Sequence, residues 1–159
     1  VTIKKYISSN NSIYGIQGKL GNIFSLNNND ILTDDKFSLG GRSLRGFDIY
    51  GVGPRNSRSS YIGGNNIASL KLDYSYEITR QSNFPFFLNI FNDYGLIWEN
   101  KTAPTQNDNN IRSSVGFGIR YYSPVGPIGL TWGFPIMDEE YDIKRMFLFS
   151  IGNLDWSQF

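Results

Sequence analysis

Polar and apolar residues alternate with a period of two along much of this chain. In residues 66–78 the even positions from 70 onward carry large apolar side chains, whereas the odd positions are mostly polar. The even set from residue 70 onward is Leu70, Leu72, Tyr74, Tyr76 and Ile78, and the odd set is Ile67, Ser69, Lys71, Asp73, Ser75 and Glu77. Because successive side chains of a β-strand point to opposite faces, the segment is predicted to be a strand with one apolar and one polar face.

Six further segments show apolar residues at alternate positions, so we expect seven strands and no helix. These segments are residues 2–8, 14–20, 87–98, 111–121, 128–134, and a short set made of Phe147, Phe149 and Ile151. Alternation in residues 87–98 is less regular than in the others, but Leu88, Ile90, Tyr94, Leu96 and Trp98 mostly share one face. The chain is therefore predicted to be all-β.

The connections between these segments alternate between short and long. Short connections lie at residues 9–11, 80–85 and 123–127, and long ones lie at residues 23–64, 100–110 and 137–144. An antiparallel up-and-down meander produces this alternation when its two ends face different environments.

The composition of the two faces favours a membrane barrel over a soluble sandwich or a lipocalin-like barrel. A soluble fold would expose a richly charged face, whereas the polar face here is mainly Ser, Gly, Thr and Gln, and only 18% of the chain is charged. The residues expected to face lipid are Leu70, Leu72, Tyr74, Phe117, Ile119, Leu130 and Trp132, and those expected to face the lumen are Lys71, Asp73, Arg112 and Arg120. Seven strands cannot close such a barrel without leaving unpaired edges in lipid, so we expect the chain to be the last part of a longer protein.

Several kinds of chemistry are disfavoured by composition. The chain has no Cys, which removes the thiolate metal ligand. It also has no His, which is the commonest general base and the commonest metal ligand. A Ser–Lys or carboxylate site stays open, but we expect no enzyme, no cofactor and no metal. The acidic loop tip Asp138, Glu139 and Glu140 is interpreted as solvated, and a net charge of +1 gives no reason to expect nucleic acid.

Residues 40–55 read "GGRSLRGFDIYGVGPR", with five glycines and three arginines and no strand period. A phosphate loop is disfavoured, since no GxxxxGK[ST] motif is present and no amphipathic helix follows. A solvated loop is the alternative. Phe47, which lies among Arg42, Arg45 and Arg55, instead favours packing against a partly enclosed polar surface.

This stretch resembles the signature loop of the BamA superfamily of outer-membrane assembly and translocation barrels, which reads [VI]RGF or [VI]RGY. Leu44, Arg45, Gly46 and Phe47 match it, with Leu in place of Val or Ile, and the flanking Gly40, Gly41, Gly53 and Pro54 also fit. Farther along, "FNDYGLIW" (91–98) is similar to the family's FxDxGxxW strand. "GIRYYSPVGPIGLTWGFPI" (118–136) is similar to its final hairpin, and "FLFSIG" (147–152) to its C-terminal strand.

The resemblance implies an antiparallel up-and-down transmembrane β-barrel of about sixteen strands, of which residues 1–159 supply about the last seven. It also implies that the loop at residues 23–64 folds back into the lumen. There Arg45 would reach Asp73 and Asp93 on the two following strands, Gly46 would approach the wall closely and Phe47 would anchor the tip. Asp73 already falls on the polar face by its period.

The closing strand implied by the resemblance contains Phe147, Phe149, Ile151 and Gly152, and glycine is expected to weaken its pairing. The segment "NLDWSQF" continues past Gly152, with the terminal aromatic at Phe159, which departs from the family pattern. The family's periplasmic domains and first strands are not represented in the sequence.

The function implied by the resemblance is that of an assembly factor, which folds and inserts β-barrel proteins into the outer membrane of a Gram-negative-type bacterium. Its expected partners are outer-membrane lipid, unfolded β-barrel clients and accessory lipoproteins. Two alternatives remain: a sister translocator of the same superfamily, for two-partner secretion or autotransporter assembly, and a passive porin.

Overall fold

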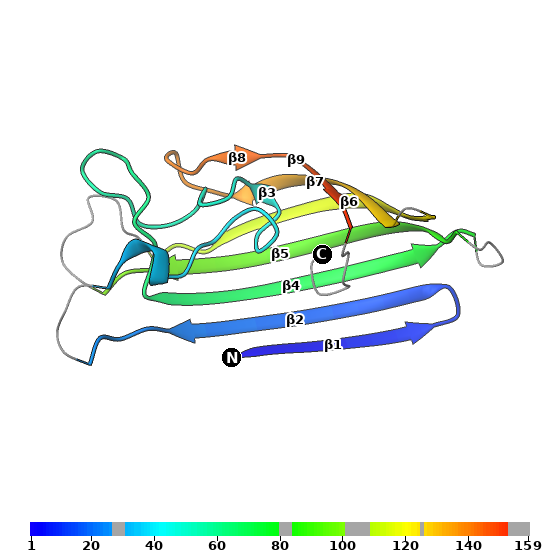
Figure 1. The fold of residues 1–159 in the computed structure, drawn as a ribbon, viewed down its shortest axis with the longest axis horizontal. Helices are drawn as coiled ribbons and strands as arrows, with labels where there is room; N and C mark the ends of the chain where they lie inside the picture. Colours follow the sequence, from blue (N-terminus) through cyan, green and yellow to red (C-terminus); the bar gives the residue numbers. More distant parts are fainter. Residues whose placement is uncertain (27–30, 80–83, 101–108, 125, 153–159) are drawn as a thin grey trace.

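The computed structural model describes residues 1–26, 31–79, 84–100, 109–124 and 126–152, and these residues are almost entirely β. One antiparallel sheet contains seven strands in the order β1-β2-β4-β5-β6-β7-β9 (Figure 1). They are β1 Thr2–Ser9, β2 Ser12–Asn22, β4 Asn66–Glu77, β5 Phe86–Trp98, β6 Arg112–Ser123, β7 Gly126–Met137 and β9 Phe147–Ile151. Each strand pairs with the next strand of the sheet along the chain, which confirms the predicted up-and-down topology. Strands β1 and β9 lie at opposite edges, so the sheet is open.

Two short elements were not expected from the period of the sequence. Strands β3 (Gly46–Phe47) and β8 (Lys144–Arg145) pair with each other in a separate antiparallel ladder. A single 3₁₀ turn covers Thr33–Asp35. Elements of two or three residues are too short to show a period of 2 or 3.6, so only the folded chain reveals them. In the described ranges, no helix has the length and apolar character needed to cross a membrane.

The long connections and the tight turns lie at opposite ends of the sheet (Figure 1). Strands β1 and β2 are joined by a two-residue turn in which Asn10 has a φ of 51°. Asn tolerates this left-handed conformation better than most residues, which suits it to a tight hairpin. At the other end, the chain between β2 and β4 turns back over one face of the sheet.

The register of the sheet confirms the division into a polar and an apolar face. Lys71 is paired with Asp93, and Asp73 with Phe91, so these four side chains share one face. The polar face also carries Arg112 and Arg120, which are both buried. The apolar face is exposed over a wide area, including Leu70, Leu72, Leu88, Ile90, Phe117, Tyr121 and Phe134.

The polar face also contains apolar side chains, of which only Ile67 was named from the sequence pattern. Ile67, Phe87, Phe91 and Ile97 all lie on it and are buried. Ile67 and Ile97 are covered by side chains of the long loop, and Phe91 lies beneath the guanidinium of Arg45. The loop therefore buries apolar area that would otherwise be exposed on the polar face of the sheet.

The last strand is short, and its register is defined by its pairing with β7. The paired residues run from Ile128 with Ile151 to Trp132 with Phe147. Gly152, expected within this strand, lies just beyond it, where it has a φ of 89° and its N–H donates to the carbonyl of Pro127 at 3.0 Å. The segment 153–159, with the terminal Phe159, lies outside the described residues.

Candidate functional site

The glycine-rich loop has a folded backbone that depends on positive φ angles. Gly40, Gly41, Gly46 and Gly53 have φ values of 127°, 59°, 93° and 132°. Only glycine adopts such angles without steric cost, which explains the glycines of the motif. The N–H of Gly41 donates to the carbonyl of Phe47 at 2.9 Å and closes the turn that presents Leu44 and Arg45 to the sheet.

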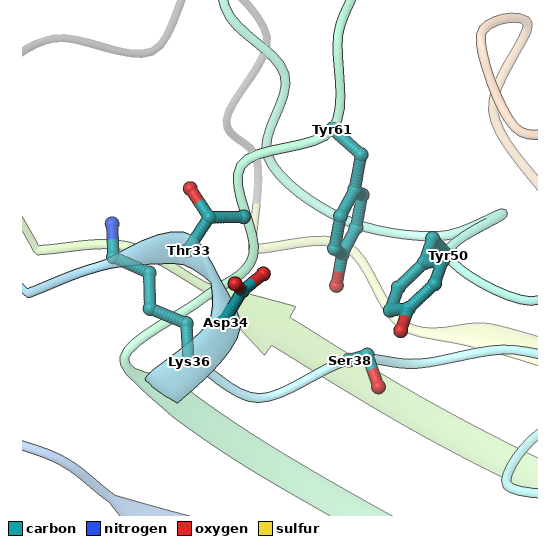
Figure 2. Close-up of a pocket in the computed structure, with 6 residues that line it drawn as sticks. All are labelled: Thr33, Asp34, Lys36, Ser38, Tyr50 and Tyr61. Atoms are coloured by element: carbon teal, nitrogen blue, oxygen red, sulfur yellow. The ribbon is translucent and has the colours of Figure 1, made fainter.

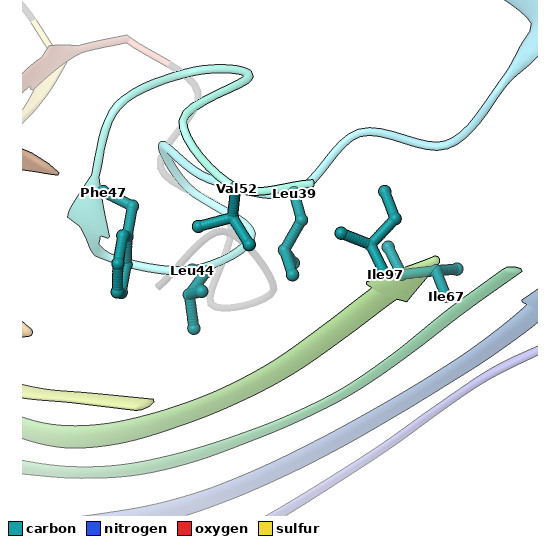
Figure 3. Close-up of a cluster of buried hydrophobic side chains, with 6 residues drawn as sticks. All are labelled: Leu39, Leu44, Phe47, Val52, Ile67 and Ile97. Atoms are coloured by element: carbon teal, nitrogen blue, oxygen red, sulfur yellow. The ribbon is translucent and has the colours of Figure 1, made fainter. Parts of the chain in front are cut away.

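Four apolar side chains of the loop pack onto the sheet. Leu39, Leu44, Phe47 and Val52 form one buried cluster with residues of β4 and β5, drawn in Figure 3. The strand residues of the cluster are Ile67 and Ile97. Complete burial of one such side chain contributes about 1.5–3 kcal/mol, so the cluster stabilises the docked loop substantially. Pro54 of the motif is also fully buried.

Arg45 projects from the loop and contacts Asp93 of β5 and Asp73 of β4. Its Nε donates to Oδ2 of Asp93 at 2.7 Å, and its Nη2 donates to Oδ1 of Asp93 at 2.5 Å. Its Nη1 donates to Oδ1 of Asp73 at 2.7 Å. The backbone N–H of Arg45 also donates to Oδ2 of Asp93, at 3.1 Å. One planar guanidinium thus joins two neighbouring strands, a geometry that an ammonium group cannot reproduce.

Three further side chains complete the surroundings of Arg45. The guanidinium carbon lies 3.6 Å from the ring centre of Phe91, a cation–π contact. Lys71, also on β4, donates from Nζ to the carbonyl of Arg42 at 2.8 Å and so holds the backbone of the loop. Arg120 of β6, which is buried on the same face, also interacts electrostatically with Asp73 and Arg45. Arg45, Lys71 and Arg120 therefore place three positive charges beside the two negative charges of Asp73 and Asp93.

The Arg45–Asp93 pair is shielded from solvent. The side chain of Arg45 is 2% exposed and that of Asp93 is 0% exposed, whereas that of Asp73 is 15% exposed. Burial by itself lowers the pKa of Arg45, but attraction and hydrogen bonds from Asp93 and then Asp73 raise it, and the net pKa lies above its ordinary value. Removal of one partner from a buried pair of this kind destabilises a protein by about 3–5 kcal/mol, because the other charge loses its partner.

Gly46 brings the backbone of the loop against strand β7. A Cβ atom placed on Gly46 would lie 3.2 Å from the carbonyl carbon of Gly133, which is tighter than an ordinary contact. Directly after Gly46, Phe47 pairs with Lys144 in the β3–β8 ladder. The loop is therefore held by contacts with β4, β5 and β7 of the sheet and by pairing with β8.

A second buried Arg–Asp pair lies on the same face, and its acidic partner was not predicted from the sequence. Arg112 of β6 donates from Nε to Oδ2 of Asp142 at 2.7 Å and from Nη2 to Oδ1 of the same residue at 3.3 Å. Asp142 lies in the connection between β7 and β9, two residues beyond the acidic tip. Nor is that tip merely solvated, because Asp138 pairs with Lys144, and Glu139 accepts a hydrogen bond from Asn110.

The long loop also borders an open polar pocket of about 520 Å³, shown in Figure 2. Its lining residues are Thr33, Asp34, Lys36, Ser38, Tyr50 and Tyr61. Lys36 forms an ion pair with Glu99 at 2.7 Å, and the hydroxyl of Tyr61 donates to the carbonyl of Phe37. Burial raises the pKa of the Tyr61 hydroxyl above its ordinary value. The ion pair fastens the loop to the residue that follows β5, and the Tyr61 hydrogen bond joins the two ends of the loop to each other.

The charged side chains around Arg45 are engaged in holding the loop on the sheet. Among the residues that the structure describes, no group of three or more His, Cys, Asp or Glu side chains could hold a metal ion. Arg45, Asp73 and Asp93 are engaged with one another, and Lys71 is engaged with the loop. Of the three motif arginines, Arg42 is exposed and Arg55 is buried against the carbonyls of Tyr50, Gly51 and Ser59.

An antiparallel meander with an exposed apolar face, and with a long loop attached to its polar face, defines a portion of an outer-membrane type of β-barrel. The profile of the Omp85 superfamily domain matches residues 1–154, and the chain belongs to this superfamily. The resemblance stated from the sequence motifs is thereby confirmed.

Two curated relatives and one solved structure are similar to this chain. A SAM50-like protein of Schizosaccharomyces pombe is 30% identical over 146 residues, which is 87% of this chain and 30% of the relative. The outer membrane protein assembly factor BamA of Nitratidesulfovibrio vulgaris is 30% identical over 131 residues, which is 77% of this chain and 16% of the relative. The crystal structure of BamA from Haemophilus ducreyi lacking POTRA domains 1–3 has a TM-score of 0.76 at 22% identity, and the match covers 93% of this chain and 33% of that one. The chain therefore spans less than a third of the length of either curated relative.

Proposed function

We propose that residues 1–159 are the C-terminal part of the barrel of an outer-membrane assembly factor, which folds and inserts β-barrel proteins. The docked loop braces the lumen through Arg45, Gly46 and Phe47, and the polar face of the sheet lines that lumen. No covalent bond is made or broken in this activity, so the protein is not an enzyme. The similarity to an assembly factor named BamA supports the proposal.

The observation that carries the proposal is the attachment of Arg45 to Asp93 and Asp73. A passive pore gains conductance from an open lumen, whereas this loop fills space on the polar face with a buried apolar cluster and a charged pair. A brace of this kind keeps the middle of the sheet rigid. Changes in strand pairing are then confined to the edges of the sheet.

The edge at β9 is the part of the sheet suited to a client. Strand β9 pairs with β7 through only five residues, whereas β4, β5, β6 and β7 have twelve or thirteen residues each. A client strand adds to such an edge by backbone hydrogen bonds, as in β-augmentation. The closing strand, with Phe147, Phe149 and Ile151 on its apolar face, would pair weakly with the first strand of the whole barrel and open there.

The proposed location is the outer membrane of a Gram-negative-type bacterium, with lipid, unfolded β-barrel clients and accessory lipoproteins as partners. The wide exposed apolar face supports contact with lipid. The SAM50-like relative comes from Schizosaccharomyces pombe, which is not a bacterium. The similarity to it therefore fits an outer-membrane location in general and does not by itself favour a bacterial one.

The proposal is tested with the full-length protein in lipid vesicles, by measurement of the rate at which an unfolded barrel client becomes protease-resistant. We expect Arg45→Ala to slow client insertion strongly and Arg45→Lys to restore it only in part, because an ammonium group cannot bridge both carboxylates. Arg58→Ala, at an exposed position of the same loop, is the matched control. Insertion at the normal rate by Arg45→Ala would contradict the brace.

The same vesicles separate the two alternatives. A passive porin would conduct ions without accelerating client insertion. A sister translocator would move a soluble passenger segment across the vesicle membrane and leave barrel clients unfolded. Either result would replace the assembly function while leaving the loop geometry unchanged.

A further inference from the structure

The connection between β7 and β9, residues 138–146, is attached to the polar face at a point that the loop motif does not include. Asp142 accepts two hydrogen bonds from the guanidinium of Arg112, which also donates to the hydroxyl of Tyr141 at 3.2 Å and to the carbonyl of Asn110 at 2.8 Å. The side chains of Arg112 and Asp142 are 2% and 0% exposed. This pair is therefore as well shielded as Arg45 and Asp93.

The same connection is hydrogen-bonded to the long loop. The carbonyl of Ile143 accepts from the N–H of Asp48 at 2.8 Å, and the N–H of Ile143 donates to the carbonyl of Gly51 at 3.0 Å. The adjacent β8 pairs with β3, and the carbonyl of Met146 accepts from the N–H of Gly133 at 2.8 Å. Residues 142–146 are thus fastened continuously, up to the residue before β9 begins at Phe147.

We propose that Arg112 and Asp142 are positioning residues that fix where the closing strand begins and keep its first residues paired with β7. The physical reason is the shortness of β9. A strand held by five paired residues separates readily from its neighbour unless the chain leading into it is anchored. The inference goes beyond the proposed function, because it concerns the pairing of two strands of this chain and applies whatever the client is.

The anchor differs from the Arg45 brace in what it controls. Arg45 reaches back to β4 and β5 and holds the middle of the sheet. Arg112 stands on β6 and holds the chain that enters β9. Loss of the Arg112–Asp142 pair should therefore loosen β9 while β4 and β5 keep their normal protection.

Amide hydrogen exchange of the full-length protein in lipid vesicles, with and without substitutions at this pair, tests the inference. We expect Asp142→Asn to speed exchange of the β9 amides at least about tenfold and Asp142→Ala to speed it further, with β4 and β5 unchanged. Asp142 also accepts the N–H of Glu139 at 2.9 Å, so its loss could act through the local turn. Arg112→Lys leaves that turn intact, and it should speed exchange of β9 as well.

A matched control comes from the exposed ion pair in the same connection. Asp138→Asn removes the partner of Lys144, whose side chain is 48% exposed, and exchange of β9 should stay at the normal rate. Unchanged β9 exchange in both Asp142→Asn and Arg112→Lys would overturn the inference. Equal acceleration in β4, β5 and β9 would overturn it too, because the pair would then stabilise the whole sheet and not position one strand.

A second measurement reports the pairing directly. Thr131 and Leu148 are register partners in β7 and β9, and the chain has no other cysteine to interfere. Oxidation of the Thr131→Cys, Leu148→Cys protein should form a disulfide quickly, and more slowly when Asp142→Asn is added. Ser75 and Asn89, partners in β4 and β5, provide the control pair, whose rate should not change. Neither measurement requires client assembly. If the inference about β9 fails, the proposed function is therefore unaffected, and if the proposed function fails, the inference about β9 is unaffected.

Discussion

Gly133 of β7 lies so close to Gly46 that a Cβ atom added to Gly133 would come 2.6 Å from the Gly46 nitrogen. The next nearest atoms are the carbonyl carbon of Arg45 and the Cα of Gly46, both at 2.9 Å. All three belong to the backbone, which cannot rotate away as a side chain can. Two glycines far apart in the sequence therefore permit the loop to rest on the sheet.

We expect Gly133→Ala to push the loop off β7 and to destabilise its docked state by about 1–3 kcal/mol, as overpacking does. Trypsin should then cut after Arg45, which is buried in the docked loop. Gly18→Ala is the control, because a Cβ at Gly18 would meet no atom within 4 Å. Equal resistance to trypsin in the two variants would show that the contact does not matter.

The two carboxylates around Arg45 should contribute unequally. Asp93 accepts three hydrogen bonds from Arg45 and is fully buried, whereas Asp73 accepts one and is 15% exposed. We expect Asp93→Ala to lower the free energy of unfolding by about 3–5 kcal/mol. Asp73→Ala should lower it by about 1–3 kcal/mol. Urea titration of the full-length protein in vesicles, followed by tryptophan fluorescence, measures both, and the reverse order would contradict the geometry.

A charge on the apolar face should be tolerated less well at the middle of a strand than near its end. Leu72 is central in β4, and Tyr76 is next to the last residue of that strand, with both side chains exposed. If this face meets lipid, Leu72→Arg should destabilise the barrel by about 2–4 kcal/mol and Tyr76→Arg by about 0–1 kcal/mol. Folding equilibria in vesicles measure the difference. Similar small effects at both positions would argue against a lipid-facing surface.

A covalent bond between β9 and the first strand of the full-length barrel should block assembly if these two strands must separate. Ser150 lies in β9 on the polar face. If β9 meets the first strand of the full-length barrel, as proposed above, a cysteine at position 150 can be cross-linked to a cysteine in that strand. We expect the oxidised protein to insert clients slowly and the reduced protein to recover. Full activity while locked would remove the opening of β9 from the proposed mechanism.

The sequence predicted the sheet well because each long strand repeats its pattern several times. In β4 and β6 the period of two places Leu72 and Phe117 on one face and Lys71 and Arg120 on the other, as the structure does. The burial of Ile67 and Ile97 was not predictable from the period, because an apolar residue on a polar face is explained only by the loop that covers it. That loop has no period, so its packing through Leu39 and Val52 left no pattern to detect.

The polar contacts were predictable to different degrees for a similar reason. Asp73 and Asp93 became candidates through the motif resemblance, and for Asp73 the period of its strand agreed. Asp142 had neither kind of support, since it follows an acidic loop tip, and acidic loop tips are normally solvated. Arg112 could have indicated Asp142, because a charged side chain on the polar face is expected to be paired, and the nearby connections contain acidic residues.

The attachment of one loop to Asp73, Asp93 and Gly133 has a consequence for how the barrel folds. These residues come from β4, β5 and β7, and a slip of one residue in any of these strands would turn the required position to the opposite face. The loop can therefore dock only after three strands have paired correctly. We expect docking of the loop to be the last folding step. A sheet with misaligned strands would leave the loop undocked and Arg45 accessible to proteases, so correctly paired chains would be retained and misaligned chains degraded.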